Sequence, residues 1–265
     1  MEGLKVYPVE SKARLSAFIK LSWKIYKRDK NWVRPLLIQL KDTFNPKKNP
    51  YYSHAEVQLF IVERDGEPVG RIAAHINHAH NEFHKDTVGF FGFFECMPDY
   101  EAAQMLFDNV TEWLEKRGIT VLRGPMNFST NDECGLLVEG FDKPPFVMMT
   151  YNPPYYKEFL EQYGFQKSKD LLAYFVDYDR IPSMLENMMN RLKRRKRFII
   201  RKVNPKKLEQ EISTMFELYN QAWQHNWGFV PMDKKEFSHT AQQLKQIADF
   251  DMVLIAEVDG TPVGF

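Results

Sequence analysis

Glu95 is the first residue whose type and position could do chemistry. It ends the apolar run Thr87–Glu95 (TVGFFGFFE), which is typical of a buried strand. Burial raises the pKa of a carboxyl group, and a carboxylate at the end of such a strand could accept a proton from an amine. The alternative is a carboxylate that caps the helix expected after Pro98. Glu95 is therefore a candidate general base, and the capping role stays open.

A second group of polar side chains follows the short buried strand expected at Thr120–Arg123. The segment 124–146 has no clear periodicity, which in a compact domain is typical of a functional or specially packed loop. Polar groups beyond the carboxyl end of a strand often bind ligands in α/β folds, although they can also cap one another. These residues are Asn127, Ser129, Thr130, Asn131, Asp132 and Glu133, of which Asp132 is a candidate catalytic carboxylate and Asn127 and Asn131 are candidate binding residues.

Tyrosines near the next helix could supply a phenol. Asn152, followed by two prolines, is expected to cap a helix that runs to Tyr163 and ends at Gly164. Tyr155 at the start of this helix is a candidate proton donor, and Asn152 is a candidate binding residue. The alternative is that the neighbouring tyrosines only pack against the core.

The cysteines and histidines form no recognisable site. Cys96 and Cys134 have no histidine partner in the sequence and cannot make a disulfide framework, so we interpret them as small buried hydrophobes. His75, His78, His80 and His84 match no closed zinc spacing, and three of them fall in or near the polar connection expected over Asn77–Asp86. The sequence therefore predicts no metal site.

The clearest element is a hairpin over Val57–Ile76. Asp65-Gly66 supplies the positive φ angles of a tight turn between two apolar runs. Other signals predict a helix capped by Ser11, a helix over Tyr100–Lys116 and a final strand over Leu171–Tyr178. A Met-rich, basic helix is expected over Ile181–Arg197, and its apolar face is predicted to lie in a core. That face comprises Leu185, Met188, Met189 and Leu192.

Two parts of the chain repeat. The hairpin is matched by Met252–Phe265 at an offset of 194, and the opening Lys5–Pro8 is matched by Lys202–Pro205 at an offset of 197. The difference predicts three extra residues in the first copy, in the loop 45–53. We expect a complete domain over residues 1–180, a basic helical linker over 181–200 and a truncated second domain over 201–265, with a helix at Asp233–Ile247.

Composition narrows the class of protein. The chain has 265 residues, 44% of them hydrophobic, so it should bury a core. Its formal net charge of +1 gives no overall electrostatic field that would attract nucleic acid or membranes. The start of the chain lacks a secretory signal pattern, which predicts a cytoplasmic location. The basic run 191–207 could touch RNA or anionic lipid, but a solvated helix face or an interdomain contact is favoured.

The order of elements resembles the GNAT acyltransferase superfamily, because a strand, two helices, a hairpin and a strand precede a helix, a strand and a helix ending in Gly164-Phe165. The segment GPMNFSTNDECGLLVEGF also resembles a bacterial GNAT-like family. The resemblance implies an α/β (α+β) fold with a mixed, mostly antiparallel sheet flanked by helices, complete in the first copy and incomplete in the second. It also implies a tandem arrangement.

The resemblance implies a coenzyme A-dependent N-acyltransferase with acetyl-CoA or another acyl-CoA as cofactor. By position, pantetheine and pyrophosphate would be bound by Phe93, Phe94, Cys96 and Met97. These residues lie between the end of the expected strand and the start of the following helix. The glycine-rich phosphate loop of the superfamily is absent here, Asp99 and Glu101 place negative charge there, and Leu160 stands where a tyrosine is usual.

Three functions follow from these observations. The first is transfer of an acyl group to a small-molecule or peptide amine, and the second is a non-catalytic protein that binds a ligand or partner in the same groove. The third is a Fem-like peptidyltransferase that uses aminoacyl-tRNA, suggested by the doubled fold and the basic run. No membrane partner is expected, nucleic acid is disfavoured, and the cut edge of the second hairpin leaves a homo-oligomer open.

Overall fold

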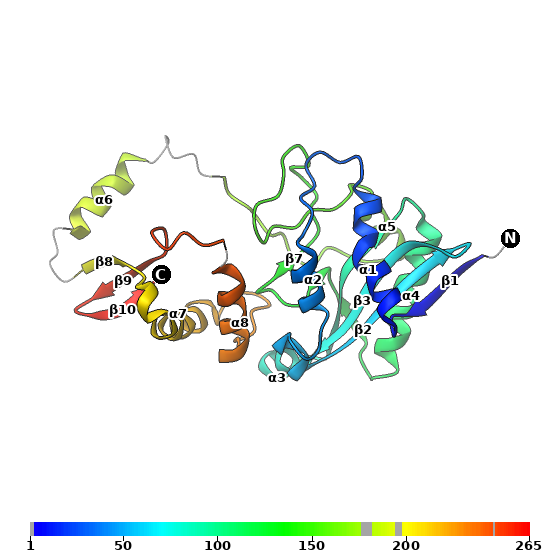
Figure 1. Cartoon of the computed structure of the whole chain (residues 1–265), viewed down its shortest axis with the longest axis horizontal. Helices are drawn as coiled ribbons and strands as arrows, with labels where there is room; N and C mark the ends of the chain where they lie inside the picture. Colours follow the sequence, from blue (N-terminus) through cyan, green and yellow to red (C-terminus); the bar gives the residue numbers. More distant parts are fainter. Residues whose placement is uncertain (1–2, 176–181, 194–197, 246) are drawn as a thin grey trace. The chain divides into compact units, whose positions relative to one another are not determined.

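The computed structural model describes residues 3–175, 182–193, 198–245 and 247–265. The chain divides into two compact units, Met1–Lys169 with Gly228–Val230, and Asp170–Trp227 with Pro231–Phe265. Each unit contains both helices and strands (Figure 1). The expected fold class, a mixed α/β structure with a mostly antiparallel sheet flanked by helices, is confirmed. Among the described residues, no helix combines the length and apolar character needed to span a membrane.

The first unit is built on a five-stranded sheet with the order β1-β2-β3-β4-β5. Neighbouring strands are antiparallel except β4 and β5, which are parallel. The elements are β1 (Leu4–Pro8), α1 (Lys12–Ile25), α2 (Leu37–Thr43), the 3-10 helix η1 (Pro50–Ser53), β2 (Ala55–Arg64), β3 (Glu67–Asn77), α3 (His78–His84), β4 (Val88–Cys96), α4 (Tyr100–Glu115), β5 (Val121–Arg123), β6 (Met126–Asn127), β7 (Glu133–Cys134) and α5 (Tyr156–Tyr163).

The predicted hairpin and two helix starts are confirmed. Asp65 and Gly66 have φ angles of 52° and 82°, as a type I′ turn requires. Ser11 caps α1 by accepting a hydrogen bond from the backbone N–H of Arg14, and Asp99 caps α4 in the same way through Ala102.

Alternate residues of the central strands face two separate cores. One face packs against α4 and α5 through Ile72, Ala74 and Leu106. The opposite face packs against α1 and α2 through Ala73 and Phe18. Because side chains alternate along a strand, Arg71 and His75 lie on the α1 face with Ala73. A charged residue and a histidine are thus built into the middle of the sheet.

Several sequence-based expectations for the first unit are wrong. Helix α3 replaces much of the polar connection expected over Asn77–Asp86, because Asn77 accepts a hydrogen bond from the His80 N–H and caps the helix. Strand β5 is an edge strand with one exposed and two half-buried residues, and not a buried strand. No strand forms over residues 171–175, which are exposed, and residues 176–178 of that expected strand lie outside the described part of the chain.

The second unit has a three-stranded sheet with the order β10-β9-β8. Its elements are α6 (Ser183–Lys193), β8 (Phe198–Lys202), the 3-10 helix η3 (Pro205–Lys207), α7 (Leu208–Trp223), α8 (Lys234–Leu244), β9 (Leu254–Val258) and β10 (Thr261–Gly264). Asp233 and Glu236 form a capping box at the start of α8.

The Met-rich face of α6 is not in a core. Leu185, Met188 and Met189 are exposed, so the expected core role is wrong for these three residues, and the side chain of Leu192 lies outside the described part. The helix has few apolar partners, since its contacts within the described residues are mainly with β8.

The strand registers of the two units repeat at one constant offset. Leu4 pairs with Arg64, and Phe198 pairs with Val258, each partner lying 194 residues further along the chain. Pro68 pairs with Glu63 and Pro262 with Glu257, and both hairpins have a register shift at this place. The offset of 197 expected for the first strand is therefore wrong, whereas the three extra residues expected in the loop 45–53 stay a prediction.

Candidate active site

A bulge in β4 sets the position of the candidate base. Between the pairs Gly92–Ala73 and Glu95–Arg71, β4 contains one residue more than β3. Phe93 within the bulge has a φ of 49°, in the left-handed region that bulky residues rarely adopt. The bulge brings Glu95 opposite Arg71 on the neighbouring strand.

Glu95 and Arg71 form a buried ion pair. Arg71 Nη2 lies 3.7 Å from Glu95 Oε1, and the two side chains are 6% and 13% exposed. Arg71 Nη1 also donates to the Phe18 carbonyl of α1 at 2.6 Å. Burial raises the pKa of Glu95, and this effect outweighs the opposing charge of Arg71. The carboxyl group is therefore easier to protonate than an ordinary glutamate, which suits an acceptor of a substrate proton.

Two tyrosines complete the polar cluster around Glu95. The Tyr156 hydroxyl donates to Glu95 Oε2 at 2.8 Å and accepts the backbone N–H of Cys96 at 2.7 Å. The pKa of Tyr26, at the end of α1, is raised by burial and then by the Glu95 charge. Both phenols thus stay protonated beside the carboxylate.

The cluster keeps unused hydrogen-bonding capacity. The Ser22 hydroxyl and the Arg71 Nε–H are buried and make no hydrogen bond to any described residue. Buried polar groups in native proteins are usually satisfied, and exceptions occur at functional sites. An amine or hydroxyl of a bound ligand could supply the missing partner.

The free edge of β4 is covered by side chains of the same unit. Strand β5 pairs with β4 only over Val88–Phe90. Beyond that point the Phe93 N–H donates to Asn127 Oδ1 at 2.6 Å, and the Tyr155 hydroxyl donates to the Cys96 carbonyl at 2.7 Å. These are the backbone groups that the resemblance assigns to pantetheine, and here the chain itself occupies them.

The start of α4 carries negative charge that an arginine compensates. Arg64 Nε donates to Asp99 Oδ2 at 2.9 Å, and Arg64 Nη2 lies 3.0 Å from Glu101 Oε2. The Met97 N–H donates to the Val69 carbonyl at 2.8 Å. The capping role considered for Glu95 is wrong, because Asp99 caps this helix. A pyrophosphate at this helix start would meet two carboxylates.

The other predicted residues serve their own loops or the core. Asp132 accepts a hydrogen bond from Ser129 at 2.9 Å, and Asn131 Nδ2 donates to the Val230 carbonyl at 3.2 Å. Phe94 packs against Phe107 and Tyr156 at ring distances of 4.9 and 4.8 Å. These contacts are not to Glu95.

Asn152 does not cap α5, which begins at Tyr156, so that expectation is wrong. Its amide instead bonds both backbone groups of Leu137, accepting at 2.7 Å and donating at 3.2 Å. Asn152 thereby holds the long loop against the segment before α5.

Arg71 and Tyr26 are the site residues that the sequence analysis missed. Arg71 stands alone as a charge in the apolar run VGRIAAHI, and a charge within a strand that is otherwise apolar is a usable signal. Tyr26 gives no such signal, because only the packing of α1 brings it near Glu95.

Both ring nitrogens of His75 are within hydrogen-bonding distance of protein groups. His75 is fully buried, with Nδ1 2.8 Å from the Tyr51 hydroxyl and Nε2 3.1 Å from the Met126 carbonyl. No set of three or more His, Cys, Asp or Glu side chains within the described ranges is arranged to hold a metal ion.

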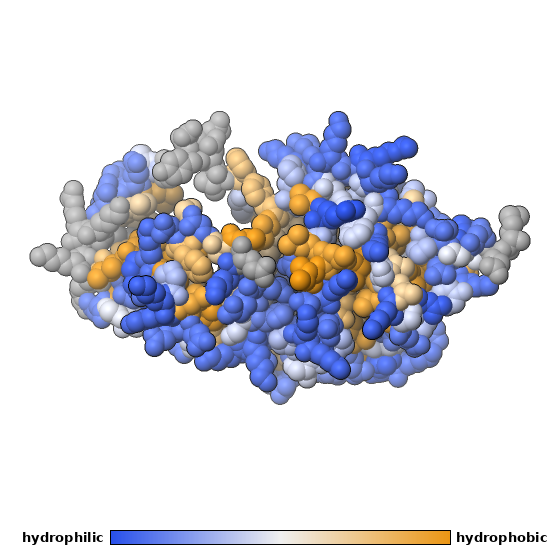
Figure 2. All heavy atoms as spheres, viewed as in Figure 1, coloured by the Kyte–Doolittle hydropathy of each residue, from blue (hydrophilic) through white to orange (hydrophobic). Residues whose placement is uncertain are grey.

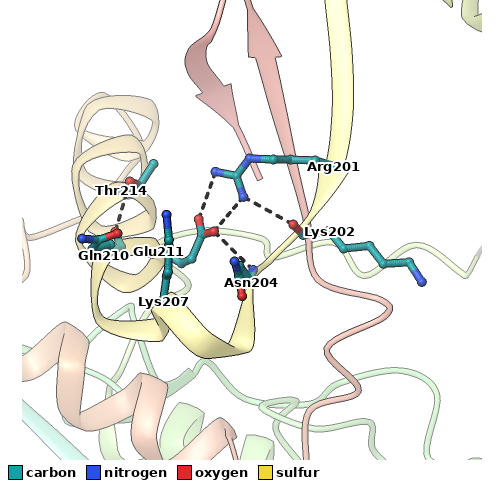
Figure 3. Close-up of a pocket in the computed structure, with 7 residues that line it drawn as sticks. All are labelled: Arg201, Lys202, Asn204, Lys207, Gln210, Glu211 and Thr214. Carbon is teal, nitrogen blue, oxygen red and sulfur yellow. Dashed lines mark hydrogen bonds and ion pairs between the residues drawn. The ribbon is translucent and has the colours of Figure 1, made fainter.

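The second unit contains a hollow of about 500 Å³ (Figure 3). Its lining residues are Arg201, Lys202, Asn204, Lys207, Gln210, Glu211 and Thr214. Arg201 pairs with Glu211 at 2.7 Å and with Glu257 at 2.6 Å, so its charge is already neutralised. We interpret the hollow as the surroundings of an ion-pair network that joins β8, α7 and β9.

The basic run that suggested tRNA is only partly described. Lys202 pairs with Asp251 at 2.9 Å, and Arg201 is neutralised as above. Residues 194–197, its densest part, lie outside the described residues.

Solved structures resemble part of the backbone. An aminoglycoside acetyltransferase, meta-AAC0020, from an uncultured soil metagenomic sample in complex with sisomicin has a TM-score of 0.41 at 9% identity, covering 66% of this chain and 95% of that chain. AAC(6')-Iy in complex with a bisubstrate analog has a TM-score of 0.41 at 14% identity, covering 66% of this chain and 99% of that chain. With values this low, neither structure informs the chemistry of this chain.

The relatives by sequence are much nearer. The chain matches no protein-family model. It is 36% identical to Protein YghO of Escherichia coli (strain K12), over 96% of this chain and 65% of that protein. It is 38% identical to the bacterial ceramide synthase of Caulobacter vibrioides, over 98% of this chain and 68% of that protein. The chain thus spans about two thirds of the length of these relatives, and it belongs to the family that includes this bacterial ceramide synthase.

Proposed function

We propose that the protein is an N-acyltransferase that moves a long-chain acyl group from coenzyme A to the amine of a long-chain amino alcohol. The substrate class rests on the relative named a ceramide synthase, since a ceramide is the amide of a fatty acid and a sphingoid base. The observation that carries the chemistry is Glu95, a carboxylate buried between Arg71, Tyr156 and Tyr26 with a raised pKa.

In the proposed reaction, Glu95 accepts the proton of the substrate ammonium, which frees the nitrogen lone pair. The nitrogen attacks the thioester carbonyl and the C–S bond breaks. The thiolate takes a proton from a phenol, and the proton that the new amide nitrogen then loses returns to that phenol. Tyr155 is the proposed donor, because its hydroxyl lies at the free edge of β4, where it donates to the Cys96 carbonyl at 2.7 Å. Burial raises the pKa of Tyr155, so the phenol holds its proton until the thiolate forms.

Replacing the base tests this function. We expect Glu95→Gln to lower kcat with palmitoyl-CoA and sphinganine by about 100-fold or more, because an amide cannot accept the ammonium proton. The measurements are thiol release and the amide product by mass spectrometry. Glu158→Gln, an exposed glutamate on α5, is the matched control and should retain wild-type turnover. Wild-type-like turnover of Glu95→Gln would exclude Glu95 as the base.

A non-catalytic binding protein is the second candidate, and the site contains an observation in its favour. The β4 edge is already occupied by Asn127 and Tyr155, and Asp99 and Glu101 lie at the start of α4. Calorimetric titration with palmitoyl-CoA distinguishes the two. Heat of binding together with turnover supports the enzyme, whereas binding of a long-chain amine without any acyl transfer supports the second candidate.

A further inference from the structure

An apolar turn projects from the first unit. The Met149 N–H donates to the Phe146 carbonyl at 3.0 Å, which closes a four-residue turn through Val147 and Met148. Met148 has a φ of 64°, a position that turns usually give to glycine or asparagine. The four side chains are 71%, 69%, 45% and 41% exposed. The turn thus exposes four large apolar side chains to solvent. One of them, Met148, also has a positive φ angle, which is unfavourable for a residue with a side chain.

A second exposed segment is tied to the loop that carries this turn. Asn31 Nδ2 donates to the Phe141 carbonyl at 2.9 Å, and the Tyr151 hydroxyl donates to Asp29 at 2.7 Å. The two segments run side by side above α2 (Figure 1). Val33 and Leu36 on the second segment are also more than half exposed. We name Val33, Leu36 and Phe146–Met149 the two-loop surface.

The surroundings of the two-loop surface are basic. The segment 27–41 contains the five cationic residues Lys27, Arg28, Lys30, Arg34 and Lys41 and the single acidic residue Asp29. The companion segment 138–151 contains Glu139, Asp142 and Lys143, so the two together carry +3, against +1 for the whole chain. Apolar residues also gather over α2 in the space-filling view (Figure 2). Exposed apolar side chains surrounded by cationic residues are suited to a layer of anionic lipid headgroups, because the apolar groups can insert and the cations can contact the phosphates.

Aromatic residues lie beneath these apolar side chains. Tyr26 stacks on Trp32 with ring centroids 4.9 Å apart, and its ring lies 6.1 Å from that of Tyr151. Tyr26 is buried, whereas Trp32 and Tyr151 are half-buried and belong to the two residue types that are enriched at the depth of lipid headgroups. Glu95 raises the pKa of Tyr26, so the aromatic residues that carry the two segments lie next to the polar cluster.

We propose that the two-loop surface docks on an anionic phospholipid bilayer, with its apolar side chains among the headgroups and its cations against the phosphates. This binding is peripheral, and it reverses the expectation that the protein has no membrane partner. It goes beyond the proposed function, although it would place the polar cluster beside the layer in which a long-chain amine dissolves.

Vesicle flotation tests the docking, without acyl donor or amine. The wild type should float with phosphatidylcholine vesicles that contain phosphatidylglycerol, and much less with phosphatidylcholine alone. Val147→Ser with Met148→Gly should weaken partitioning at least tenfold while keeping Tm, because glycine suits the positive φ of position 148. Val121→Ser, at a similarly exposed valine on β5, is the matched control and should float like the wild type.

A charge variant tests the attraction between the cationic residues and the anionic headgroups. Lys27→Gln with Lys30→Gln should lower binding to the anionic vesicles by about fivefold per charge and weaken its salt dependence. Absence of flotation with anionic vesicles, or equal flotation of the Val147→Ser, Met148→Gly variant, would overturn the proposal. Light scattering that shows a dimer for the wild type and a monomer for the Val147→Ser, Met148→Gly variant would also overturn the proposal. The two-loop surface would then bind a second copy of the chain and not a bilayer. None of these three outcomes affects the Glu95 test.

Discussion

At the scale of single residues, two buried ionisable groups share one face of β3. Arg71 and His75 lie on the face that packs against α1, and Glu95 is the strand partner of Arg71. Arg71 and Glu95 compensate each other, whereas His75 is held neutral. Their titration behaviour should differ accordingly.

His75 should make the protein sensitive to mild acid. Burial lowers its pKa to about 3, below the ordinary value of about 6.5, so from pH 6.5 downward the unfolded chain binds a proton that the folded protein excludes. The unfolding free energy therefore falls as the pH falls, by about 2 kcal/mol between pH 7 and pH 5 from this residue.

His75→Gln, which does not titrate, should lose about 2 kcal/mol less than the wild type over this pH interval. Urea unfolding at the two pH values measures the difference, and His78→Gln is the control because His78 is exposed. Equal slopes for the wild type and His75→Gln would contradict the assignment.

The sequence predicted part of this site. Glu95 was recognisable, because it ends an apolar run before a helix start. Arg71 and Tyr26 were not chosen, since nothing local says which residue of β3 faces Glu95. That depends on the extra residue in the β4 bulge, which shifts the register. The ligand-binding roles expected for Asp132 and Asn152 stay predictions, and the contacts that these residues make fold the loop itself.

At the scale of elements, the approach of β6 to β4 decides what the sheet edge can bind. Gly92 and Met126 meet backbone to backbone, so a Cβ built on Gly92 would lie 1.9 Å from the Met126 carbonyl oxygen. A backbone atom cannot turn aside as a flexible side chain can. The pairing of Asn127 with the Phe93 N–H depends on this close approach.

Gly92→Ala should therefore destabilise the protein. We expect a loss of about 1–3 kcal/mol, the usual cost of overpacking, and faster exchange of the Phe93 amide as β6 moves away. Denaturant unfolding and hydrogen exchange measure the two effects. Gly264→Ala is the matched control, because nothing lies within 4 Å of a Cβ built there. A Gly92→Ala protein as stable as this control would be inconsistent with the close approach.

Elements with strong local signals were predictable, and those that depend on tertiary partners were not. The Asp65-Gly66 turn and the α4 cap follow from local chemistry. The strand expected at Leu171–Tyr178 has an apolar run but no partner strand over its described residues, and the apolar face of α6 likewise has little to pack against. Periodicity shows which side of an element is apolar, but not whether another element covers it.

At the scale of the whole molecule, we propose that the second unit is an incomplete repeat of the first. The support is the constant offset of 194 between the registers of β1, β2 and β3 and those of β8, β9 and β10, with the register shift at the same place. Even the bond from the Val9 N–H to the Leu59 carbonyl recurs as Val203 to Val253.

The stability of the second unit should depend on the ion pairs of Arg201 with Glu211 and Glu257. Glu211 is buried, and Arg201 holds the pKa of its carboxyl group below the usual range. Glu211→Ala should lower the unfolding free energy of this unit by about 1–3 kcal/mol, because Arg201 loses a bidentate partner. Hydrogen exchange should accelerate in β8 and β9 and not in β2 and β3.

Glu209→Ala is the matched control for this change, because Glu209 is an exposed glutamate in the same first turn of α7. Equal acceleration of exchange in β2 and β3 as in β8 and β9 would show that the two units unfold together.

The burial of Glu95 also bears on a competing reaction. A thioester can be hydrolysed as well as aminolysed, and bulk water at about 55 M outnumbers any amine. A general base open to solvent would activate either nucleophile. Glu95 is screened by Arg71, Tyr156 and Tyr26, so in the proposed reaction only a molecule that enters this cluster meets the carboxylate. The same screening that raises its pKa would thus favour the amide product over the free fatty acid.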